Sequence, residues 1–188
     1  MVVHEPREQA FQLILETLGA GNIVVMLCDT IYGLIGVSPD TERRIRFVKG
    51  RQEGKPFINL IPDVSWLPRM TESGMPELLK NHWPGPLTLI FPARGGGTVG
   101  LRVPEDEVLR RLMLRLGKPL FSTSVNRGGR PPLNSIQRIV EEFSADVDLI
   151  VDSGDAGNRR PSTIIDLTKT PFEVVRRGAV DIGDAAKG

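Results

Sequence analysis

The sequence predicts one α/β domain over residues 1–188, in which helices flank a twisted sheet of mixed parallel and antiparallel strands. Three observations carry this prediction. A chain of 188 residues with 40% hydrophobic content is large enough for one compact core. Strand-like and helix-like patterns alternate early in the chain, which favours parallel strands. Strand-like runs then follow one another near the C-terminus, which favours antiparallel pairing, and no internal repeat or long linker divides the chain.

Helices are predicted where apolar residues recur at every third or fourth position. Residues 7–18 show this spacing and end at Gly19. A second helix is opened by Ser38-Pro39-Asp40, with Pro39 at the first helical position. Further helices are predicted at residues 76–83, at 104–116 and from Asn134 to 143, where Asn134 and Gln137 form a capping pair.

Strands are predicted at short apolar runs. They cover residues 23–27, 57–61, 87–91, 99–103, 120–123, 148–151, 162–167 and 172–176. The first run leads into the stretch LCDTIYGLIG, residues 27–36, where several hydrogen-bonding side chains follow a buried strand. We expect these side chains at a binding edge of the sheet, with Gly33 and Gly36 letting the backbone turn beneath a ligand.

Composition excludes several classes of protein. The net charge of +1 is too small for a uniformly basic nucleic-acid binder, although a local basic cleft is compatible with it. Cys28 is the only cysteine, which excludes an internal disulfide and a cysteine-based zinc site and is typical of a reducing compartment. No apolar run is long enough to span a membrane, and the N-terminus lacks a signal-peptide pattern. We therefore expect a cytoplasmic protein without a membrane partner.

Common catalytic motifs are absent from the sequence. GGGTVG, residues 95–100, formally matches a dinucleotide-binding pattern, but a strand signal follows where that motif requires a helix. The chain has no P-loop pattern, and its two histidines, His4 and His82, are isolated. The sequence predicts no metal site.

Short polar clusters follow several of the predicted strands. They are Cys28-Asp29-Thr30-Ile31-Tyr32-Gly33-Leu34, Lys49-Gly50-Arg51 with Lys55-Pro56, Pro84-Gly85-Pro86-Leu87-Thr88, Arg102-Val103-Pro104, Ser122-Thr123-Ser124-Val125-Asn126, Ser162-Thr163 and Arg176-Arg177-Gly178. Each cluster alone has an ordinary interpretation as a solvated helix end or a polar strand edge. Together they predict one ligand site, because α/β sheets bind ligands beyond the ends of their strands. Hydroxyls and fixed cations without a catalytic histidine favour phosphate binding.

In this order and spacing, these motifs resemble the YrdC family of threonylcarbamoyl-AMP synthases, over about residues 10–180. The resemblance implies a single YrdC-like domain of the short form, with a basic concave face. It implies an enzyme that makes threonylcarbamoyl-adenylate and pyrophosphate from L-threonine, bicarbonate and ATP. Mg²⁺ is expected to accompany the ATP. The product serves threonylcarbamoyladenosine modification at position 37 of tRNA through a separate transferase complex, and a direct tRNA contact is left open.

The resemblance also implies a role for individual residues. Lys49 and Arg51 are expected to neutralise the phosphates and carry catalysis. The residues expected at ATP are Lys49, Arg51, Lys55, Thr98, Ser124, Asn126 and Arg176. The residues expected at threonine are Cys28, Thr30, Tyr32, Arg102, Ser122 and Ser162, with Arg102 holding the carboxylate in a two-pronged contact. No general base is expected in the protein.

Three departures from the family pattern leave alternatives open. Leu27-Cys28 stands where most members have Pro-Thr, and that threonine contacts the amino acid. Two hydroxyls expected near ATP are replaced at Gly128 and Pro132, and Arg127 and Arg130 are hypothesised to compensate electrostatically. One alternative is therefore a YrdC-like paralogue that adenylates a different substrate. The other is an RNA-binding module, which is poorly supported because basic and aromatic residues are not interleaved.

Overall fold

A computed structural model describes residues 1–4, 6–51 and 56–182. In that part of the chain, ten strands form one sheet in the order β1-β8-β2-β3-β7-β4-β6-β5-β9-β10. The strands are β1 (Val2–Val3), β2 (Val24–Leu27), β3 (Tyr32–Val37), β4 (Ile58–Leu60), β5 (Leu87–Pro92), β6 (Thr98–Arg102), β7 (Leu120–Ser124), β8 (Leu149–Val151), β9 (Thr163–Asp166) and β10 (Glu173–Arg176). The α-helices are α1 (Phe11–Gly19), α2 (Glu42–Lys49), α3 (Leu67–Met70), α4 (Glu107–Leu116) and α5 (Ile136–Phe143), and two 3₁₀ helices are η1 (Val64–Trp66) and η2 (Glu77–His82).

The sheet is mixed, as predicted. β8 runs parallel to both β1 and β2, and the pairs β4–β6 and β5–β9 are also parallel. The other adjacent pairs, including the late hairpin of β9 and β10, are antiparallel. The prediction of a mixed sheet flanked by helices is therefore confirmed.

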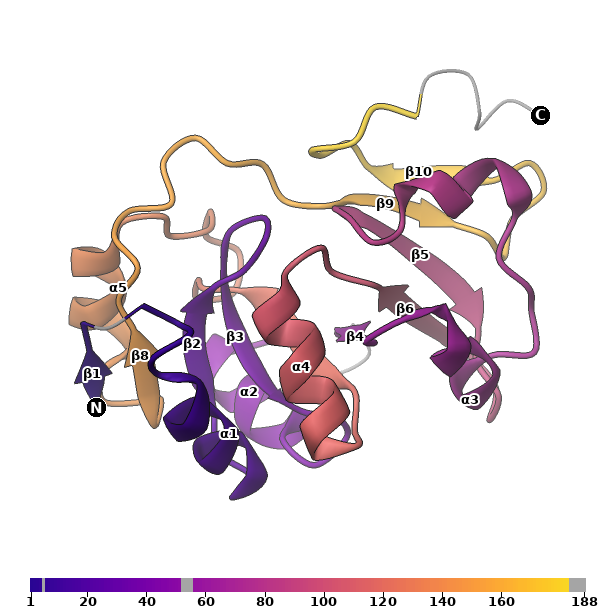
Figure 1. Cartoon of the computed structure of the whole chain (residues 1–188). Helices are drawn as coiled ribbons and strands as arrows, with labels where there is room; N and C mark the ends of the chain where they lie inside the picture. Colours follow the sequence, from indigo (N-terminus) through magenta and orange to yellow (C-terminus); the bar gives the residue numbers. More distant parts are fainter. Residues whose placement is uncertain (5, 52–55, 183–188) are drawn as a thin grey trace.

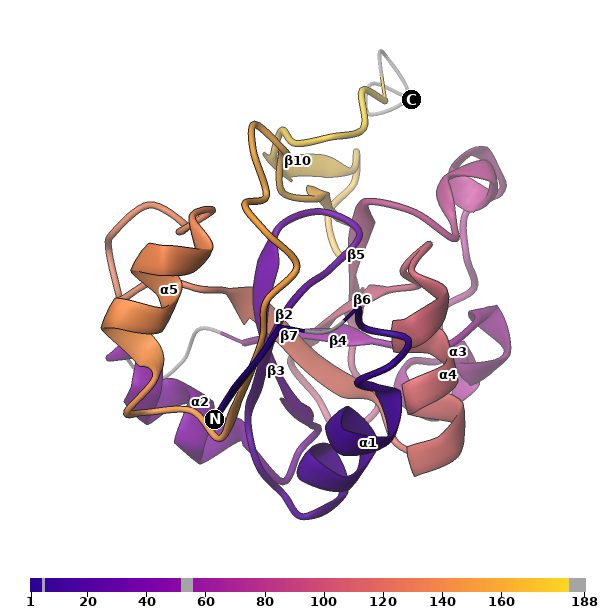
Figure 2. The ribbon, with the colours of Figure 1, turned by 60° about the vertical axis from the view of Figure 1, so that its left-hand side comes forward.

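Two helical layers cover one half of the sheet. α1 and α4 lie on one side of β2, β3 and β7, whereas α2 and α5 lie on the other side (Figures 1 and 2). Each layer has its own buried hydrophobic cluster, and a third cluster joins η1, α3 and η2 to β5 and β6. The short strand β4 links the two halves of the sheet, because it pairs with β7 on one side and β6 on the other.

The helices end where the sequence supplies caps. Asp106 accepts a hydrogen bond from the Leu109 amide at 3.1 Å and so caps the start of α4, and Gly117 ends that helix with a φ of 65°. Gly50 ends α2 in the same left-handed conformation, with a φ of 58°. This places Lys49 in the last turn of α2, next to the end of β7.

Two sequence signals predicted to open helices do not do so, and α1 and α4 also begin later than predicted, at Phe11 and Glu107. α2 begins at Glu42 after Thr41, and Pro39 precedes the helix in a cis peptide bond with Ser38, so Pro39 is not the first helical residue. Asn134 and Gln137 do not cap α5. Instead, the carboxylate of Asp155, which lies after β8, accepts the hydrogen bond from the Ile136 amide at 2.8 Å. The capping group is distant in sequence, so local spacing could not reveal it.

The stretch LCDTIYGLIG forms a hairpin and not a glycine turn. β2 pairs with β3 from Leu27 opposite Tyr32, and the chain reverses over residues 28–31. Gly33 and Gly36 lie inside β3, and neither has a positive φ. Gly36 is required by close approach, because an added Cβ would lie 2.2 Å from Thr41 Oγ1. The predicted turning role of these two glycines is therefore wrong.

Short or continuously buried elements were missed. β3 is buried along its whole length and so lacks the alternation that marks a half-exposed strand. β1 has two residues and α3 has four, which is too short for a periodic pattern. No helix in the described ranges has the length and apolar character of a membrane span.

Candidate functional site

Two adjoining hollows lie over the middle of the sheet, where its two halves meet. The smaller one, of about 230 Å³, is lined by Thr30, Ile31, Tyr32, Gly33, Arg51, Pro56, Phe57, Ile58, Thr88, Ile90, Gly100, Arg102, Ser122, Thr123, Ser124, Pro161, Ser162, Ile164 and Arg176. The larger one, of about 520 Å³, is lined by Lys49, Gly50, Arg51, Thr123, Ser124, Asn126, Gly128 and Gly129. Arg51, Thr123 and Ser124 line both, so the two hollows adjoin at these three residues.

Lys49 lies at the end of α2 and is held by three acceptors. Its Nζ donates to the Ser124 carbonyl at 2.5 Å, to the Asn126 carbonyl at 3.2 Å and to Asn126 Oδ1 at 2.8 Å. An ammonium has three hydrogens, so these contacts use all of them. Burial, with a contribution from nearby Arg51, lowers the pKa of Lys49 to about 8. Lys49 therefore supplies positive charge to the larger hollow and also holds the end of β7 in place.

Asn126 links Lys49 to the loop that follows β7. Its Oδ1 accepts from Lys49 Nζ and from Ser124 Oγ, the latter at 2.6 Å. Its Nδ2 donates to the carbonyls of Arg127 and Arg130 at 3.0 and 2.8 Å. The amide is thus held at both ends, which fixes the loop that follows β7.

Arg51 stands between the two hollows. Its guanidinium lies over the Phe57 ring at 4.8 Å and donates to the Pro56 carbonyl at 3.1 Å. The buried Nε has no acceptor among the described residues. Burial, followed by repulsion from Arg46, lowers the pKa of Arg51. A group in this state is stabilised by a bound anion.

Arg102 leaves the end of β6 and enters the smaller hollow beside the β2–β3 hairpin. Its Nη2 donates to Asp29 Oδ1 at 2.6 Å, and its Nη1 approaches Thr30 Oγ1 at 3.4 Å. Both members of the ion pair are buried, with side-chain exposures of 5% for Arg102 and 9% for Asp29. Asp29 Oδ2 accepts from the Glu105 amide at 3.2 Å, so both carboxylate oxygens are used.

Arg176, in β10, also lines the smaller hollow. Its Nε and Nη2 donate to the Ser162 carbonyl at 3.0 and 2.8 Å, and Nη2 also reaches Ser162 Oγ at 3.0 Å. The hydroxyl of Thr88, in β5, lies 2.9 Å from Ser162 Oγ. Burial and the nearby charge of Arg102 lower the pKa of Arg176. The two arginines therefore face the same space.

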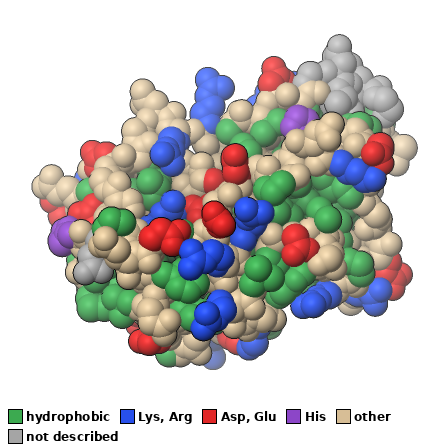
Figure 3. Space-filling view, viewed as in Figure 1, with side chains coloured by type: hydrophobic (Ala, Val, Ile, Leu, Met, Phe, Trp, Pro, Cys, Tyr) green, Lys and Arg blue, Asp and Glu red, His purple; other side chains and the backbone are tan. Residues whose placement is uncertain are grey.

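The site carries an excess of positive charge. Within the described part of the chain, no Asp or Glu side chain lines either hollow. Of its four cations, Arg102 alone forms an ion pair there, whereas Lys49, Arg51 and Arg176 have no acidic partner among the described residues. Elsewhere the charges are mixed: over α1 and α4, basic and acidic side chains alternate on the surface (Figure 3). A site with this balance is suited to a multiply charged anion.

The structure brings together most of the residues expected at the site, but not all. Those that line the hollows are Lys49, Arg51, Ser124, Asn126, Arg176, Thr30, Tyr32, Arg102, Ser122 and Ser162. Thr98 is exposed at the start of β6, paired with Pro92 after the glycine turn, and it lines neither hollow. Lys55 lies outside the described residues.

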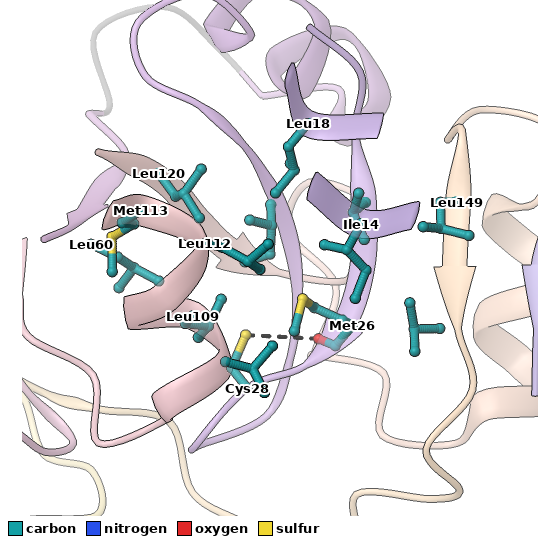
Figure 4. Close-up of a cluster of buried hydrophobic side chains, with 14 of the residues drawn as sticks. Ile14, Leu18, Met26, Cys28, Leu60, Leu109, Leu112, Met113, Leu120 and Leu149 are labelled. Carbon is teal, nitrogen blue, oxygen red and sulfur yellow. Dashed lines mark hydrogen bonds between the residues drawn. The ribbon is translucent and has the colours of Figure 1, made fainter. Parts of the chain in front are cut away.

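Cys28 is the clearest difference from the expected threonine site. Its side chain is 2% exposed and packs between β2 and α4, among Met26, Leu109 and other apolar residues (Figure 4). The thiol donates to the Met26 carbonyl, at a sulfur–oxygen distance of 3.7 Å. Burial and the neighbouring Asp29 raise the pKa of Cys28 to about 12. The thiol therefore lies in the core and does not line the hollow.

Arg127 does not face the hollow either, so the hypothesis that it compensates for lost hydroxyls there is wrong. Its guanidinium donates to the Val48 carbonyl at 2.5 Å and to the Glu142 carbonyl at 2.8 Å, and it pairs with Asp146 at 2.6 Å. It thereby ties α2 to α5. Arg130 also lines neither hollow.

Sequence reasoning gave no role to two residues that hold the site together. Asp29 accepts a hydrogen bond from Arg102, and Thr88 contacts Ser162. Both belong to the polar clusters that the sequence analysis singled out, which was the available signal. Their partners are more than 70 positions away in sequence, so only the folded chain shows what they contact.

Comparisons with known proteins identify the family of the chain. A family model described as telomere recombination, for the Sua5, YciO and YrdC proteins, matches residues 16–178. The chain belongs to the Sua5/YciO/YrdC family. Membership confirms the resemblance drawn from the motifs.

Relatives within this family include named enzymes. The chain is 30% identical over 169 residues to the threonylcarbamoyl-AMP synthase of Marinobacter nauticus, covering 81% of this chain and 88% of that protein. It is 31% identical over 182 residues to that of Pyrococcus abyssi, covering 89% of this chain and 53% of that protein. The chain thus spans about half the length of the archaeal relative.

Solved structures of the family show the same fold. P. abyssi Sua5 complexed with L-threonine is similar with a TM-score of 0.82 at 29% identity, over 95% of this chain and 57% of that one. Escherichia coli YciO has a TM-score of 0.82 at 27% identity, over 97% of this chain and 95% of that one. This chain therefore has the YrdC-like fold of the family.

Proposed function

We propose that this chain is a threonylcarbamoyl-AMP synthase, a nucleotidyltransferase that uses L-threonine, bicarbonate and ATP. One observation carries the proposal: two adjoining hollows are lined by one charge-balanced arginine and by three cations that have no acidic partner among the described residues. The unbalanced cations suit a triphosphate, and the balanced arginine suits a small carboxylate. The threonine complex of a related Sua5 and the names of the relatives support the same activity.

ATP is proposed to occupy the larger hollow and to reach Arg51 and Arg176. Lys49 and Arg51 supply positive charge from the end of α2, and the loop from Ser124 to Gly129 forms the opposite wall. The threonine is proposed to occupy the smaller hollow, with its carboxylate on Arg102 and its remaining polar atoms near Thr30, Ser122 and Ser162. Arg51 stands at the junction, where the two substrates would meet.

The proposed reaction requires positioning more than proton transfer. The threonine ammonium first loses a proton to solvent, and the resulting amine adds to bicarbonate to give the N-carboxylate and water. A carboxylate oxygen of that carbamate then attacks the α-phosphorus, a new phosphorus–oxygen bond forms, and the bond to the bridging oxygen breaks to release pyrophosphate. The attacking oxygen is already anionic, so this second step needs no protein base. Fixed cations that neutralise the developing charge are the main contribution of the protein.

Mg²⁺ is proposed to arrive with ATP, held by the phosphates. Among the described residues, no group of three or more His, Cys, Asp or Glu side chains could hold a metal ion. The cationic and hydroxyl lining fits a nucleotide that brings its own metal. No residue of this chain is assigned as a metal ligand.

The product is proposed to serve threonylcarbamoyladenosine formation at tRNA position 37, in the cytoplasm, through a separate transferase. The two alternatives are tested alongside. A paralogue would adenylate another amino acid or amine, and an RNA-binding module would bind RNA in a salt-sensitive way without turnover.

The deciding experiment follows pyrophosphate release by the purified chain with ATP, Mg²⁺ and bicarbonate. Threonine, serine and valine are compared as substrates. Release that requires both threonine and bicarbonate supports the proposal. If threonine gives the same release with and without bicarbonate, the chain is a different adenylating enzyme. A preference for another amino acid indicates the paralogue. No release with any of them contradicts an adenylating function.

Arg51→Ala and Arg138→Ala provide a matched pair of variants for this assay. Arg51 lines both hollows, whereas Arg138 is an exposed residue of α5 that pairs with Glu142. Loss of a phosphate-facing arginine is expected to lower kcat/KM for ATP by about 100-fold or more. Arg138→Ala should retain wild-type turnover. Equal turnover in both variants would contradict the assignment of Arg51.

A further inference from the structure

Among the described residues, Asp29 and Arg102 form the one ion pair that involves a cation lining the hollows. Arg102 Nη2 and Asp29 Oδ1 are 2.6 Å apart, and both side chains are nearly excluded from solvent. Removing one partner of such a pair leaves a buried charge without compensation, which is costly. The contact is therefore retained by the fold and not formed transiently at the surface.

Asp29 lies behind Arg102 and not in the hollow. Asp29 is absent from the residues that line the smaller hollow, whereas Arg102 and the adjacent Thr30 both line it. The second carboxylate oxygen accepts from the Glu105 amide, just before α4. Asp29 thus joins the β2–β3 hairpin to the end of β6 while leaving the cavity side of Arg102 free of acidic groups.

The Arg102 guanidinium keeps unused donor capacity, and its Nη1 lies beside Thr30, which also lines the smaller hollow. Arg102 Nε has no acceptor among the described residues, and Nη1 has only the long contact of 3.4 Å to Thr30. A carboxylate matches two N–H groups of one guanidinium in a bidentate contact. The orientation that permits this contact is set by what holds Nη2, which is Asp29.

We propose that Asp29 is the positioning residue of the amino-acid subsite: it fixes the Arg102 guanidinium so that its free donors bind the α-carboxylate of the substrate. The inference rests on the proposed function and goes beyond it, because it assigns the selectivity between the two substrates to one ion pair. The negative charge of Asp29 also reduces the attraction of Arg102 for a polyphosphate. Arg102 is then suited to a singly charged carboxylate, while Lys49, Arg51 and Arg176 remain available to ATP.

Asp29→Asn is the most direct test. Asparagine has nearly the same shape but only one acceptor oxygen on its side chain, whereas Asp29 accepts from both Arg102 and the Glu105 amide. One of the two contacts is therefore lost, and the guanidinium loses its counter-charge. Displacing a binding group by about 1 Å costs up to about 100-fold, so the dissociation constant for L-threonine should rise by about 10- to 100-fold. The dissociation constant for ATP should change by less than about twofold or should fall, because the site gains net positive charge.

Asp106→Asn is a matched control. Asp106 is also a buried aspartate, pairs with Arg7 and caps α4, but it lines neither hollow. It should lower the melting temperature while leaving both dissociation constants within about twofold of wild type. Asp29→Glu keeps the charge but moves the carboxylate, so it should recover part of the threonine affinity. If Asp29→Asn does not fold, the threonine and ATP affinities of Asp29→Glu provide the test.

The measurements are calorimetric titrations of L-threonine alone and of ATP alone, with the melting temperature of each variant. Selective loss of threonine binding in Asp29→Asn, with partial recovery in Asp29→Glu, supports the proposal. Unchanged threonine affinity, or equal loss of both ligands, overturns it and makes the ion pair purely structural. If wild-type protein binds no threonine, the proposed function itself fails and the assignment falls with it.

Discussion

Lys49 shows how a single buried ammonium can contribute both structure and charge. Three acceptors hold it against the end of β7, and burial lowers its pKa to about 8, against an ordinary value of 10.5. The group therefore loses its proton within a pH range that is easily measured.

The affinity for ATP is predicted to fall as the pH rises through about 8, because Lys49 then becomes neutral and the site loses one positive charge. Between about pH 7 and about pH 9 we expect a decrease of about fivefold to tenfold, measured by calorimetric titration. Lys49→Met should bind ATP more weakly at the lower pH and lose this dependence. An identical slope in the variant would contradict the role of Lys49.

The same pKa shift has a stability consequence of known sign. Since the pKa of Lys49 is lower in the folded chain than in the unfolded chain, the unfolded state binds more protons between about pH 8 and 10.5. The contribution of Lys49 to the free energy of unfolding is unfavourable below this window and rises with pH across it. Denaturant unfolding of wild type and Lys49→Met measures this difference.

Cys28 is predicted to act through packing and not through substrate contact. Cys28→Ala should lower the free energy of unfolding by about 1 to 2 kcal/mol, because it removes a buried atom from the cluster between β2 and α4. The KM for threonine should change by less than about twofold. Denaturant unfolding and the pyrophosphate assay measure the two effects. A large change in KM with unchanged stability would show that the thiol reaches the substrate.

At the scale of elements, the hairpin of β2 and β3 explains how the site is positioned. β3 pairs with β2 on one edge and β7 on the other, so the hairpin turn at Asp29 and Thr30 is held beside Ser124, which lies opposite Gly33. The start of α2 packs directly on β3 at Gly36, where Thr41 is fully buried and its hydroxyl donates to the Val37 carbonyl at 2.9 Å. The position of Lys49 thus depends on a close contact one helix length away.

Gly36→Ala tests this contact. The added Cβ would lie 2.2 Å from Thr41 Oγ1 and 2.8 Å from Thr41 Cβ, so α2 must shift. We expect a loss of about 1 to 3 kcal/mol in the free energy of unfolding, typical of overpacking. Gly100→Ala is the control, because its Cβ would meet no atom closer than 3.9 Å.

A second substitution makes the Gly36 test specific. Adding Thr41→Ala removes the clashing hydroxyl and methyl, so the double variant should recover stability relative to Gly36→Ala. Losses that simply add would show that Thr41 is not the group under strain. Denaturant unfolding of the four proteins gives the coupling energy.

At the scale of the whole molecule, a nearly neutral chain carries a strongly cationic site. The net charge is +1, yet four of its cations line the adjoining hollows and one of these alone has an acidic partner among the described residues. The face seen in Figure 3 mixes both signs of charge and gathers hydrophobic side chains over the half that carries β5 and β6. Long-range attraction of an anion is therefore expected to come from the hollow and not from the general surface.

Salt should consequently act differently on the two substrates. Raising the ionic strength from low to high is predicted to weaken ATP binding by about fivefold or more, since three unbalanced cations are screened. Threonine binding should change by less than about twofold, because Arg102 is already paired with Asp29. Calorimetric titration at both ionic strengths measures this. Equal salt dependence for the two ligands would contradict the division of the site.

The strands and helices were largely predictable because their patterns are local. The apolar runs that became β2, β5, β6 and β7 were located to within one or two residues, and α4 was marked by its spacing and by Gly117. β3 was missed because continuous burial removes the alternation that identifies a strand. The cap of α5 was missed because Asp155 approaches from a later segment.

The sequence by itself determined that this chain is a mixed α/β domain of the Sua5/YciO/YrdC family and which polar clusters follow its strands, because motif order and hydrophobic period are properties of the linear chain. Only the tertiary structure decided how those clusters meet. It turned Cys28 into the core and Arg127 toward α2 and α5, and it placed Asp29 behind Arg102. The physical reason is that the direction of a side chain and the partner of a charge depend on segments that sequence spacing does not bring together.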